Sequence, residues 1–254
     1  MLTILSPSKT SDPTPIKIHQ PTSAIFTKET AQLIAILKKK SVADLMSLMT
    51  ISEKLADQNY RRFQNFNLKM DDDFSKAAIL TFNGEVYVGL DAGGLSQQDL
   101  DFAQQHVRIL SGLYGSLRPL DLIREYRLEM GTRLTTTKGT NLYQFWRDKI
   151  TPSIHADLLR SGNNYLINLA SDEYFKSLDQ KTLHAVVIQI DFFDIKNGKR
   201  TFISFNAKKA RGMMANYIIK NRINEPSALT KFDMDGYILD SNSSTDSHFT
   251  FVRH

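Results

Sequence analysis

Apolar and polar positions follow two different periods along this chain of 254 residues. Short runs of apolar and β-branched residues bounded by turn residues predict strands. These runs cover residues 3–5, 78–82, 86–90, 165–169, 186–193, 200–205, 237–239 and 249–252. Two pairs of runs flank an Asn-Gly dipeptide, at 83–84 and at 197–198, which favours a type I′ hairpin because both turn residues accept a positive φ. We therefore expect antiparallel strand pairs.

Apolar residues three and four positions apart predict helices between these strands. The helices cover residues 29–39, 42–49, 53–63, 141–150, 152–159 and 208–222, with one more that starts after Ser96 and keeps its helical spacing to Leu110. Ser41 and Ser96 each begin a capping box, with an aspartate three residues later. Helices alternate with strands that the hairpins make antiparallel, so we expect an α+β fold with a mixed or antiparallel sheet surrounded by helices. No internal repeat or linker divides the chain, and we expect one compact domain over residues 1–254.

Residues 41–63 form a helical pair, with two short helices joined by a three-residue turn at 50–52. The stretch LMTISEKLA is similar to the helix-hairpin-helix element, in which backbone N–H groups at the turn bind a DNA phosphate and the helix dipole assists. Lys54, Arg61 and Arg62 supply positive charge beside it. The usual turn carries glycines where this chain has Thr and Ser, so an ordinary packed helical pair is the alternative.

Charge is distributed in blocks, although the formal net charge is only +5. Residues 71–102 hold one basic and seven acidic residues, net −6, whereas residues 196–222 hold eight basic residues and no acidic one, net +8. A segment with no acidic residue either faces solvent or meets an anion. A solvated basic face and a phosphate-binding surface both stay open.

The basic segment contains the clearest helix of the chain, residues 208–222. Its apolar stripe consists of Ala210, Met213, Met214, Tyr217 and Ile218. Lys208 and Lys209 lie in the first turn, where the helix dipole disfavours cations, so helix stability alone does not explain them. We expect Lys208, Lys209 and Arg211 to line a basic cleft, and the two methionines to fill the core.

The segment 111–134 is rich in arginine among tyrosines and carboxylates, with Arg118, Arg124, Arg127 and Arg133. Arginine beside aromatic residues suits phosphate pairing and base stacking. Buried ion pairs fit equally well, because Asp121, Glu125 and Glu129 lie in the same segment. The sequence leaves both interpretations open.

Composition excludes several classes of chemistry. The chain has no cysteine, which rules out disulfide scaffolds, Cys-ligated metal sites and thiol redox chemistry. Its six histidines show no metal-ligand spacing, and we expect neither a metal site nor a cofactor. The apolar runs are shorter than the ~18 residues of a membrane helix, and the first residues lack the basic region of a signal peptide. We expect a cytoplasmic protein without a membrane partner, and nothing implies an oligomer.

Four polar residues form a candidate pocket: Lys9, Glu129, Ser171 and Glu173. The stretch Ser-Pro-Ser-Lys at 6–9 matches Ser-x-x-Lys only superficially, because the accompanying β-lactamase motifs are absent. Ser171, followed by two acidic residues, equally suits a helix N-cap. These residues specify no reaction by themselves, and catalytic residues cannot be assigned.

Several motifs together closely resemble the YaaA peroxide-stress family. They are SPSKT (6–10), FNGEVYVGL (82–90), FAQQHVRILSGLYGSLRPLDLIREYRLEMGTRL (102–134), LYQFW (142–146), INLASDEYFKSL (167–178) and ISFNAKKARGMMANYII (203–219). The resemblance spans essentially the whole chain and departs at Ser8, where Ala is more usual. It implies a cytoplasmic protein induced by hydrogen peroxide, which protects DNA and protein and lowers free iron. It also implies a cantaloupe-like α+β fold with a positively charged cleft, a helix-hairpin-helix element and DNA binding without strong sequence specificity.

Three hypotheses follow. The first is a DNA-binding protein of the peroxide response, in which the cations of the helical pair, the basic helix and the arginine-rich segment meet phosphates. The second is an enzyme that acts on a nucleotide or another phosphorylated small molecule, with Lys9, Arg127, Glu129, Ser171 and Glu173 in one pocket. The third is direct iron sequestration, which the scattered histidines make the weakest.

Overall fold

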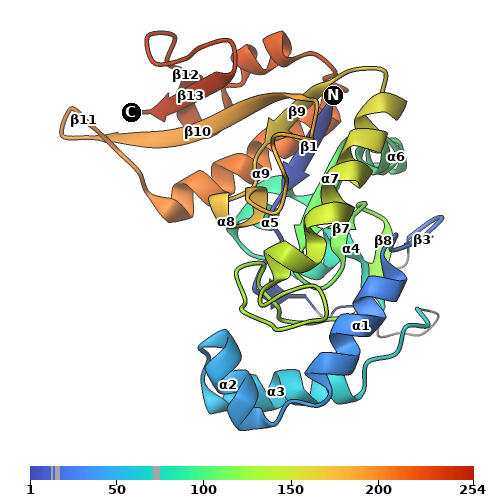
Figure 1. Cartoon of the computed structure of the whole chain (residues 1–254). Coiled ribbons are helices and arrows are strands. Elements are labelled where there is room, and N and C mark those ends of the chain that lie inside the picture. Colours follow the sequence, from blue (N-terminus) through green and yellow to red (C-terminus); the bar gives the residue numbers. More distant parts are fainter. Residues whose placement is uncertain (13, 15–17, 71–74) are drawn as a thin grey trace.

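A mixed sheet forms the centre of the molecule. The computed structural model describes residues 1–12, 14, 18–70 and 75–254. Within these residues the main sheet has eight strands, in the order β12-β13-β10-β9-β1-β6-β7 with β11 paired to β10 (Figure 1). Their bounds are β1 Leu2–Leu5, β6 Val107–Ser111, β7 Gly115–Leu117, β9 Tyr165–Asn168, β10 Val186–Lys196, β11 Lys199–Thr201, β12 Tyr237–Leu239 and β13 His248–Arg253.

The middle of this sheet is parallel and its edges are antiparallel. β6, β1, β9, β10 and β13 form successive parallel pairs, whereas β7, β11 and β12 pair antiparallel. Every residue of β1 and of β6 is buried, as expected for parallel strands covered on both faces. The α+β class with a mixed sheet is confirmed, and parallel pairing makes up its centre.

Helices and two small sheets surround this centre. The small sheets pair β2 (Thr10–Ser11) with β5 (Phe82–Asn83), and β8 (Asp121–Ile123) with β3 (Thr22–Ser23) and β4 (Lys76–Ala77). The α-helices are α1 Thr27–Leu37, α2 Val42–Met49, α3 Glu53–Gln64, α4 Ala78–Thr81, α5 Glu85–Leu90, α6 Gln97–His106, α7 Leu142–Arg160, α8 Asp172–Phe175 and α9 Ser204–Lys220. Short 3₁₀ turns are η1 Ala92–Gly94, η2 Pro226–Lys231 and η3 Met234–Gly236.

The hairpin predicted at residues 83–84 is wrong. Residues 78–81 form the helix α4 and residues 85–90 the helix α5, with only the two-residue strand β5 and Gly84 between them, and Gly84 is extended with φ 175°. The physical reason is packing: α5 lies against α9, with Tyr87 and Leu90 buried. Tertiary burial therefore outweighs the β propensity of Val86 and Val88.

The second hairpin, at residues 197–198, is confirmed. Asn197 and Gly198 have φ values of 51° and 71°, and β10 and β11 pair antiparallel on either side of them. The second strand is shorter than predicted, because α9 begins at Ser204. Figure 1 shows that this hairpin extends beyond the ends of the strands beside β10.

Several helix predictions change at their ends. The basic helix α9 begins at Ser204, so Lys208 and Lys209 lie beyond its first turn instead of within it. The capping box of Ser96 and Asp99 starts α6 as predicted, but α6 ends at His106 and the chain continues as the strand β6, so the helical spacing to Leu110 is coincidental. The two helices predicted on either side of residue 151 form one helix, α7, with Pro152 inside it. Proline removes one backbone donor, and the buried face around Trp146 and Ile154 holds the helix together.

The helical pair α2–α3 forms as predicted. Ser41 and Asp44 complete the capping box of α2, and Ser52 is the N-cap of α3 without a side-chain hydrogen bond to it. The pair lies at the end of the molecule opposite β12 and β13 (Figure 1). Leu45 and Phe63 nevertheless belong to the same hydrophobic cluster as β1 and β13. A single domain over residues 1–254 stays our prediction.

Candidate functional site

The cations of the helical pair differ in their surroundings. Lys54 is exposed in the first turn of α3. The Arg61 side chain is 74% exposed and forms a 3.0 Å ion pair with Asp57, one turn earlier. Arg62 is partly buried and pairs with Glu125. Exposed pairs are weak and open easily, so Lys54 and Arg61 remain accessible to a ligand while Arg62 is held against the body of the protein.

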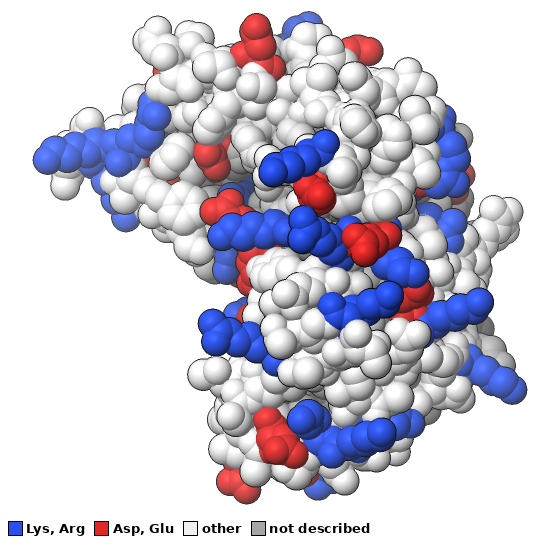
Figure 2. All heavy atoms as spheres, in the orientation of Figure 1, with Lys and Arg blue, Asp and Glu red and all other residues white. Residues whose placement is uncertain are grey.

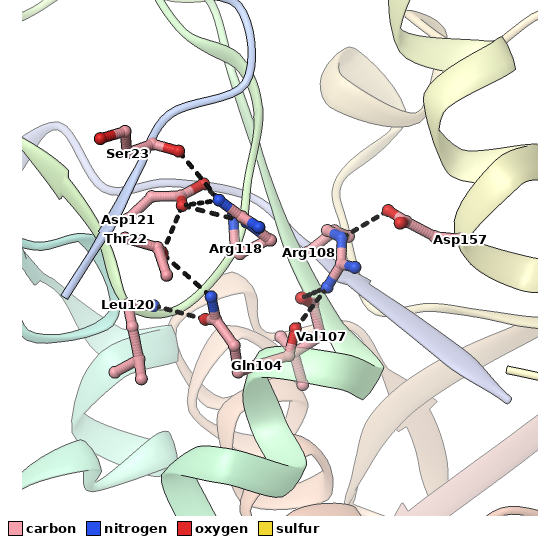
Figure 3. A network of polar contacts seen from close by, with 9 residues as sticks. All are labelled: Thr22, Ser23, Gln104, Val107, Arg108, Arg118, Leu120, Asp121 and Asp157. Atoms are coloured by element: carbon pink, nitrogen blue, oxygen red, sulfur yellow. Dashed lines mark hydrogen bonds and ion pairs between the residues drawn. The ribbon is translucent and has the colours of Figure 1, made fainter. Parts of the chain in front are cut away.

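Arg118 belongs to a network of polar contacts (Figure 3). Its Nε and Nη2 atoms donate to Asp121 Oδ1 at 3.0 and 2.8 Å, and Nη2 also donates to the backbone carbonyl of Ser23. Asp121 is fully buried and accepts a further bond from Thr22 Oγ1 at 2.6 Å. Two donors of the planar guanidinium therefore converge on one carboxylate oxygen, and such charge-assisted bonds are strong. Arg118 therefore joins β8 to β3 and the preceding loop.

The same network contains an ion pair that sequence reasoning missed. Arg108 Nε donates to Asp157 Oδ2 at 2.6 Å, and both side chains are at most 5% exposed (Figure 3). The pair ties β6 to α7. The two residues lie 49 positions apart in the sequence, and Asp157 lies outside the motifs quoted above, whereas Arg108 belongs to the motif at 102–134. A signal was present only in the charge of Arg108 between the apolar residues Val107 and Ile109 of its strand.

The other three arginines of segment 111–134 differ in their burial and in their partners. Arg124 is buried and donates to the carbonyls of Asn67 and Lys69 at 2.8 and 3.0 Å. Arg127 is partly buried and pairs with Glu129 at 3.1 Å. Arg133 is exposed. Three of the four arginines therefore have internal partners, and two of them, Arg118 and Arg127, form ion pairs with carboxylates of the same segment.

The cations of the basic helix α9 also differ in their exposure and in their partners. Lys208 is exposed, and Lys209 forms a long ion pair of 3.8 Å with Asp235. The Arg211 side chain is only 17% exposed, and its Nη2 atom lies 4.0 Å from Asp191 Oδ1. Burial lowers the pKa of the Arg211 guanidinium, since desolvation disfavours its charge. Met213 and Met214 are buried in the core, as predicted.

A cavity of about 790 Å³ brings several of these residues together. Lys9, Ser171 and Glu173 of the candidate pocket line it, and so do Lys208 and Arg211 from α9. Their segments are the loop after β1, the start of α8 and the first turns of α9. In Figure 2 the outline of the molecule is indented on the left, between the part that carries the main sheet and the part that carries the helical pair.

Glu129 joins this group through Lys9. Lys9 Nζ lies 2.8 Å from Glu129 Oε2, and Glu129 also pairs with Arg127. Glu173 accepts a 2.9 Å hydrogen bond from the Gly131 N–H. Ser171 donates its N–H to Ser6 Oγ at 2.9 Å. The residues of the predicted pocket are therefore neighbours in space, although Glu129 is linked to the cavity by its partner.

Sequence reasoning missed other residues that line the cavity. Tyr87, Asp191 and Phe202 face it. The Tyr87 hydroxyl donates to the Ser6 carbonyl at 3.0 Å, and burial raises the pKa of this phenol, so it acts as a donor at neutral pH. Tyr87 belongs to the motif at 82–90, whereas Asp191 and Phe202 lie outside the motifs and carried no sequence signal.

The chemistry of the cavity lining is that of binding by charge and hydrogen bonds. Lysine, arginine and serine groups offer donors to a phosphate, while carboxylates such as Glu173 accept hydrogen bonds or protons. In the described part of the chain, no three His, Asp or Glu side chains gather as a metal would require. Within the same residues, no helix combines the length and apolar character needed to cross a bilayer.

Basic side chains spread over the face of the molecule in Figure 2. Lys and Arg lie over both the sheet and the helical pair, with Asp and Glu between them. The face therefore offers separate positive clusters instead of one continuous stripe. Such clusters suit an extended polyanion that touches the surface at intervals.

Comparison with known proteins places the chain in a family. The family model described as "Peroxide stress protein YaaA" matches residues 1–243. A UPF0246 protein of Burkholderia multivorans (strain ATCC 17616 / 249) is 49% identical over 256 aligned residues, which cover 100% of this chain and 98% of that protein. The match includes every segment that lines the cavity and both helices of the helical pair. The chain is therefore a member of the peroxide stress protein YaaA family.

Proposed function

We propose that the protein binds DNA through its phosphate backbone, without strong sequence specificity, as part of the response to hydrogen peroxide. Membership of a peroxide stress family supports the biological setting. The observation that carries the proposal is the pair of accessible cations, Lys54 and Arg61, on the helical pair α2–α3. Lys208 on α9 is a further exposed cation. Phosphate contacts of this kind carry affinity but no sequence information.

The helical pair serves as a helix-hairpin-helix element in this proposal. Thr50 ends α2 in the left-handed conformation that the turn requires, with φ 53° and ψ 54°. Lys54 then lies in the first turn of α3, close to the turn that would face a phosphate. Arg62 positions the element through Glu125, and Arg118 and Arg124 act inside the fold. Arg127 and Lys209, whose charges are partly neutralised, and the exposed Arg133 are secondary candidates.

Protection from oxidation follows from binding in this proposal. The chain has no cysteine, so it cannot reduce peroxide or sense it by thiol chemistry. A protein that covers DNA keeps iron-dependent Fenton chemistry away from the bases. We propose that the protein acts in the cytoplasm, where its phosphate-binding cations meet DNA.

An electrophoretic shift assay with a charge-reversed variant tests this function. The variant Lys54→Glu/Arg61→Glu should bind a random 30-base-pair duplex at least tenfold more weakly, because two attractive contacts become repulsive. Its affinity should fall by the same factor for duplexes of unrelated sequence. Both side chains are exposed, so folding should not change.

The matched control is Lys231→Glu, an exposed lysine in η2 at the other end of the molecule. It changes the net charge without touching the helical pair, and one such reversal should weaken binding less than twofold. If the control and the double variant lose the same DNA affinity, binding depends on net charge alone and the helical pair is not the binding site. Wild-type protein that does not shift DNA at 50 mM salt would overturn the proposal.

A second function rests on a different observation, the cavity that gathers Lys9, Ser171 and Glu173. We propose as the alternative that the protein is an enzyme acting on a nucleotide or another phosphorylated small molecule. A largely preformed cavity lined by a few converging polar groups is the usual form of a small-molecule site. Thermal unfolding with a panel of phosphorylated metabolites tests it, since a bound ligand raises the unfolding temperature. No shift with any compound would remove this alternative and leave DNA binding untouched.

A further inference from the structure

Arg211 is a poorly paired charged group in the lining of the cavity. Its Nε atom is buried and has no hydrogen-bond partner among the described residues, and its ion pair with Asp191 spans 4.0 Å. Asp191 in turn lies 2.9 Å from His248 Nε2, on the neighbouring strand β13. Burying a guanidinium without completing its hydrogen bonds is costly. Because the Arg211 side chain lines the cavity and is 17% exposed, an anionic ligand there can complete the pairing that the distant Asp191 leaves incomplete.

Lys208 and Phe202 line the same cavity as Arg211. Lys208 precedes Arg211 by three residues on α9, so the two side chains lie on neighbouring parts of the same helix face. The ring of Phe202 is 55% exposed and touches Phe193 edge-on, with 6.2 Å between ring centroids. An exposed aromatic ring beside two cations offers stacking for a flat group next to binding for an anionic one.

The rest of the lining argues against a simple inorganic anion. Four carboxylates face the same cavity: Glu85, Asp172, Glu173 and Asp191. Together they outnumber the cations, so the cavity repels a ligand that is anionic all round. A ligand that fits has one anionic end, for Lys208 and Arg211, and hydrogen-bond donors elsewhere for the carboxylates. Sugar hydroxyls and base amino groups are such donors.

We propose that this cavity binds a nucleotide, with its phosphate on Lys208 and Arg211 and its base stacked on Phe202. The proposal rests on the second function above and assigns its ligand. The volume of about 790 Å³ lies within the range of about 300–1,000 Å³ typical of small-molecule sites. The nucleotide is either free or one unpaired unit of a DNA strand, because both present the same phosphate and base.

Isothermal titration calorimetry with deoxyadenosine 5′-monophosphate, inorganic phosphate and ribose 5-phosphate tests the assignment. Wild-type protein should bind the nucleotide more tightly than either of the other two compounds. Lys208→Ala and Arg211→Met should each weaken nucleotide binding at least tenfold. Phe202→Ala should weaken nucleotide binding at least fivefold, as expected for a lost base–aromatic stack, and should leave phosphate binding unchanged.

Three features keep the test independent of folding. Lys208 and Phe202 are exposed, so their variants retain the fold, and Lys231→Ala should bind as the wild type does. Arg211→Met keeps the volume of the side chain and removes a poorly paired buried charge, so its unfolding temperature should equal or exceed that of the wild type. An Arg211→Met protein that unfolds earlier would show that the arginine is structural and would overturn its assigned role.

The outcomes separate this inference from the proposed functions. Binding of ribose 5-phosphate equal to that of the nucleotide, with no effect of Phe202→Ala, overturns the nucleotide assignment and leaves a phosphorylated small molecule as the ligand. If none of the three compounds binds, and single-stranded dA10 binds equally well to the wild type and to all three variants, the nucleotide assignment and the second proposed function are both overturned. If only dA10 binding responds to the substitutions, the nucleotide is a unit of a strand. Duplex binding by Lys54 and Arg61 is measured separately in each case.

Discussion

Thr50 is the residue at which local conformation and residue type disagree most clearly. It ends α2 with φ 53° and ψ 54°, a conformation that costs a β-branched residue about 1–2 kcal/mol. Its side chain is exposed, so removing it loses little packing. Thr50→Gly should raise the free energy of unfolding by about 1 kcal/mol, since glycine adopts this conformation freely.

Urea unfolding measures this change. The matched control is Ser47→Gly, in the exposed interior of the same helix, which should lower the free energy of unfolding by about 0.5 kcal/mol because glycine is a poor helix former. The two substitutions lie three residues apart and should change the free energy of unfolding in opposite directions. This difference distinguishes relief of backbone strain at Thr50 from a general effect of glycine. A Thr50→Gly protein that is less stable than the wild type would contradict the strain.

Asp99 makes folding depend on pH. Its carboxylate accepts hydrogen bonds from Arg222 at 2.7 Å, from Lys220 at 3.0 Å and from the Ser96 N–H at 2.9 Å. These partners, Arg222 first, hold the pKa of Asp99 well below its usual value. The stabilisation is therefore complete above the unfolded-state pKa of about 3.9 and is lost as the pH falls below that value toward the folded-state pKa.

The variant Asp99→Asn isolates this contribution. At pH 7 it should lower the free energy of unfolding by about 2 kcal/mol, because charge-assisted hydrogen bonds between α6 and the end of α9 become neutral ones. The gap between wild type and variant should narrow in urea unfolding as the pH is lowered from 6 to 3. A gap that stays constant over this range would show that the charge of Asp99 is not what stabilises the fold.

At the scale of single residues, the sequence predicted that the arginines pair with carboxylates, but it did not predict which carboxylate pairs with which arginine. The carboxylates near the arginine-rich segment, Asp121 and Glu129, were recognised as candidate partners, and they pair with Arg118 and Arg127. Glu125 instead pairs with Arg62, 63 residues earlier in the sequence. Spacing along the chain indicates a local pair, but it contains no information on a partner brought by another element.

At the scale of elements, two glycines allow α5 and α9 to cross closely. A Cβ at Gly212 would lie 1.8 Å from the Val86 carbonyl oxygen, and one at Gly89 would lie 2.0 Å from the Lys209 carbonyl oxygen. Both contacts are with backbone, which cannot move without separating the helices. This crossing also shapes the cavity, because Val86, Lys208 and Arg211 line it.

Gly212→Ala should therefore disturb fold and site together. We expect the free energy of unfolding to fall by about 3 kcal/mol, at the upper end of the range for overpacking, and the cavity to widen where α5 meets α9. Thermal unfolding and nucleotide titration of the same protein measure the two effects. Gly93→Ala, where an added Cβ meets nothing within 4 Å, is the control and should change neither.

Elements were predicted well where local signals agreed and poorly where packing decided. The capping boxes of α2 and α6 and the hairpin of Asn197 and Gly198 need only neighbouring residues, and each formed as predicted. The Asn-Gly pair at 83–84 carries the same local signal, but the following segment buries Leu90 against α9 as a helix. A dipeptide contains no information about α9, which begins 120 residues later and packs against the segment that follows the dipeptide.

At the scale of the whole molecule, the class of fold was predictable and the cavity was not. Alternating strands and helices, together with the hairpin of Asn197 and Gly198, lead directly to an α+β fold with a mixed sheet. The cavity combines the loop after β1 with α5, α8 and the start of α9, and Ser6 and Arg211, which both line it, are 205 positions apart in the sequence (211 − 6). Only the parallel order of β6, β1, β9 and β10 brings these ends together.

The distribution of ion pairs over the whole molecule also limits how DNA binding depends on salt. If all ten predicted cations met phosphates, the logarithm of the binding constant would fall with the logarithm of salt concentration with a slope of about −9. Arg62, Arg118 and Arg124 are engaged inside the protein, and Arg127, Lys209 and Arg211 are neutralised or buried in part.

The accessible cations are Lys54, Arg61, Arg133 and Lys208, for which the expected slope is about −3 to −4. Fluorescence anisotropy of a labelled duplex between 50 and 300 mM salt measures it. Lys54→Ala should make the slope shallower by about 1, whereas Lys231→Ala, at the far end of the molecule, should leave it unchanged. A wild-type slope near −9 would mean that the internal ion pairs open on DNA, and that the arginine-rich segment is part of the interface after all.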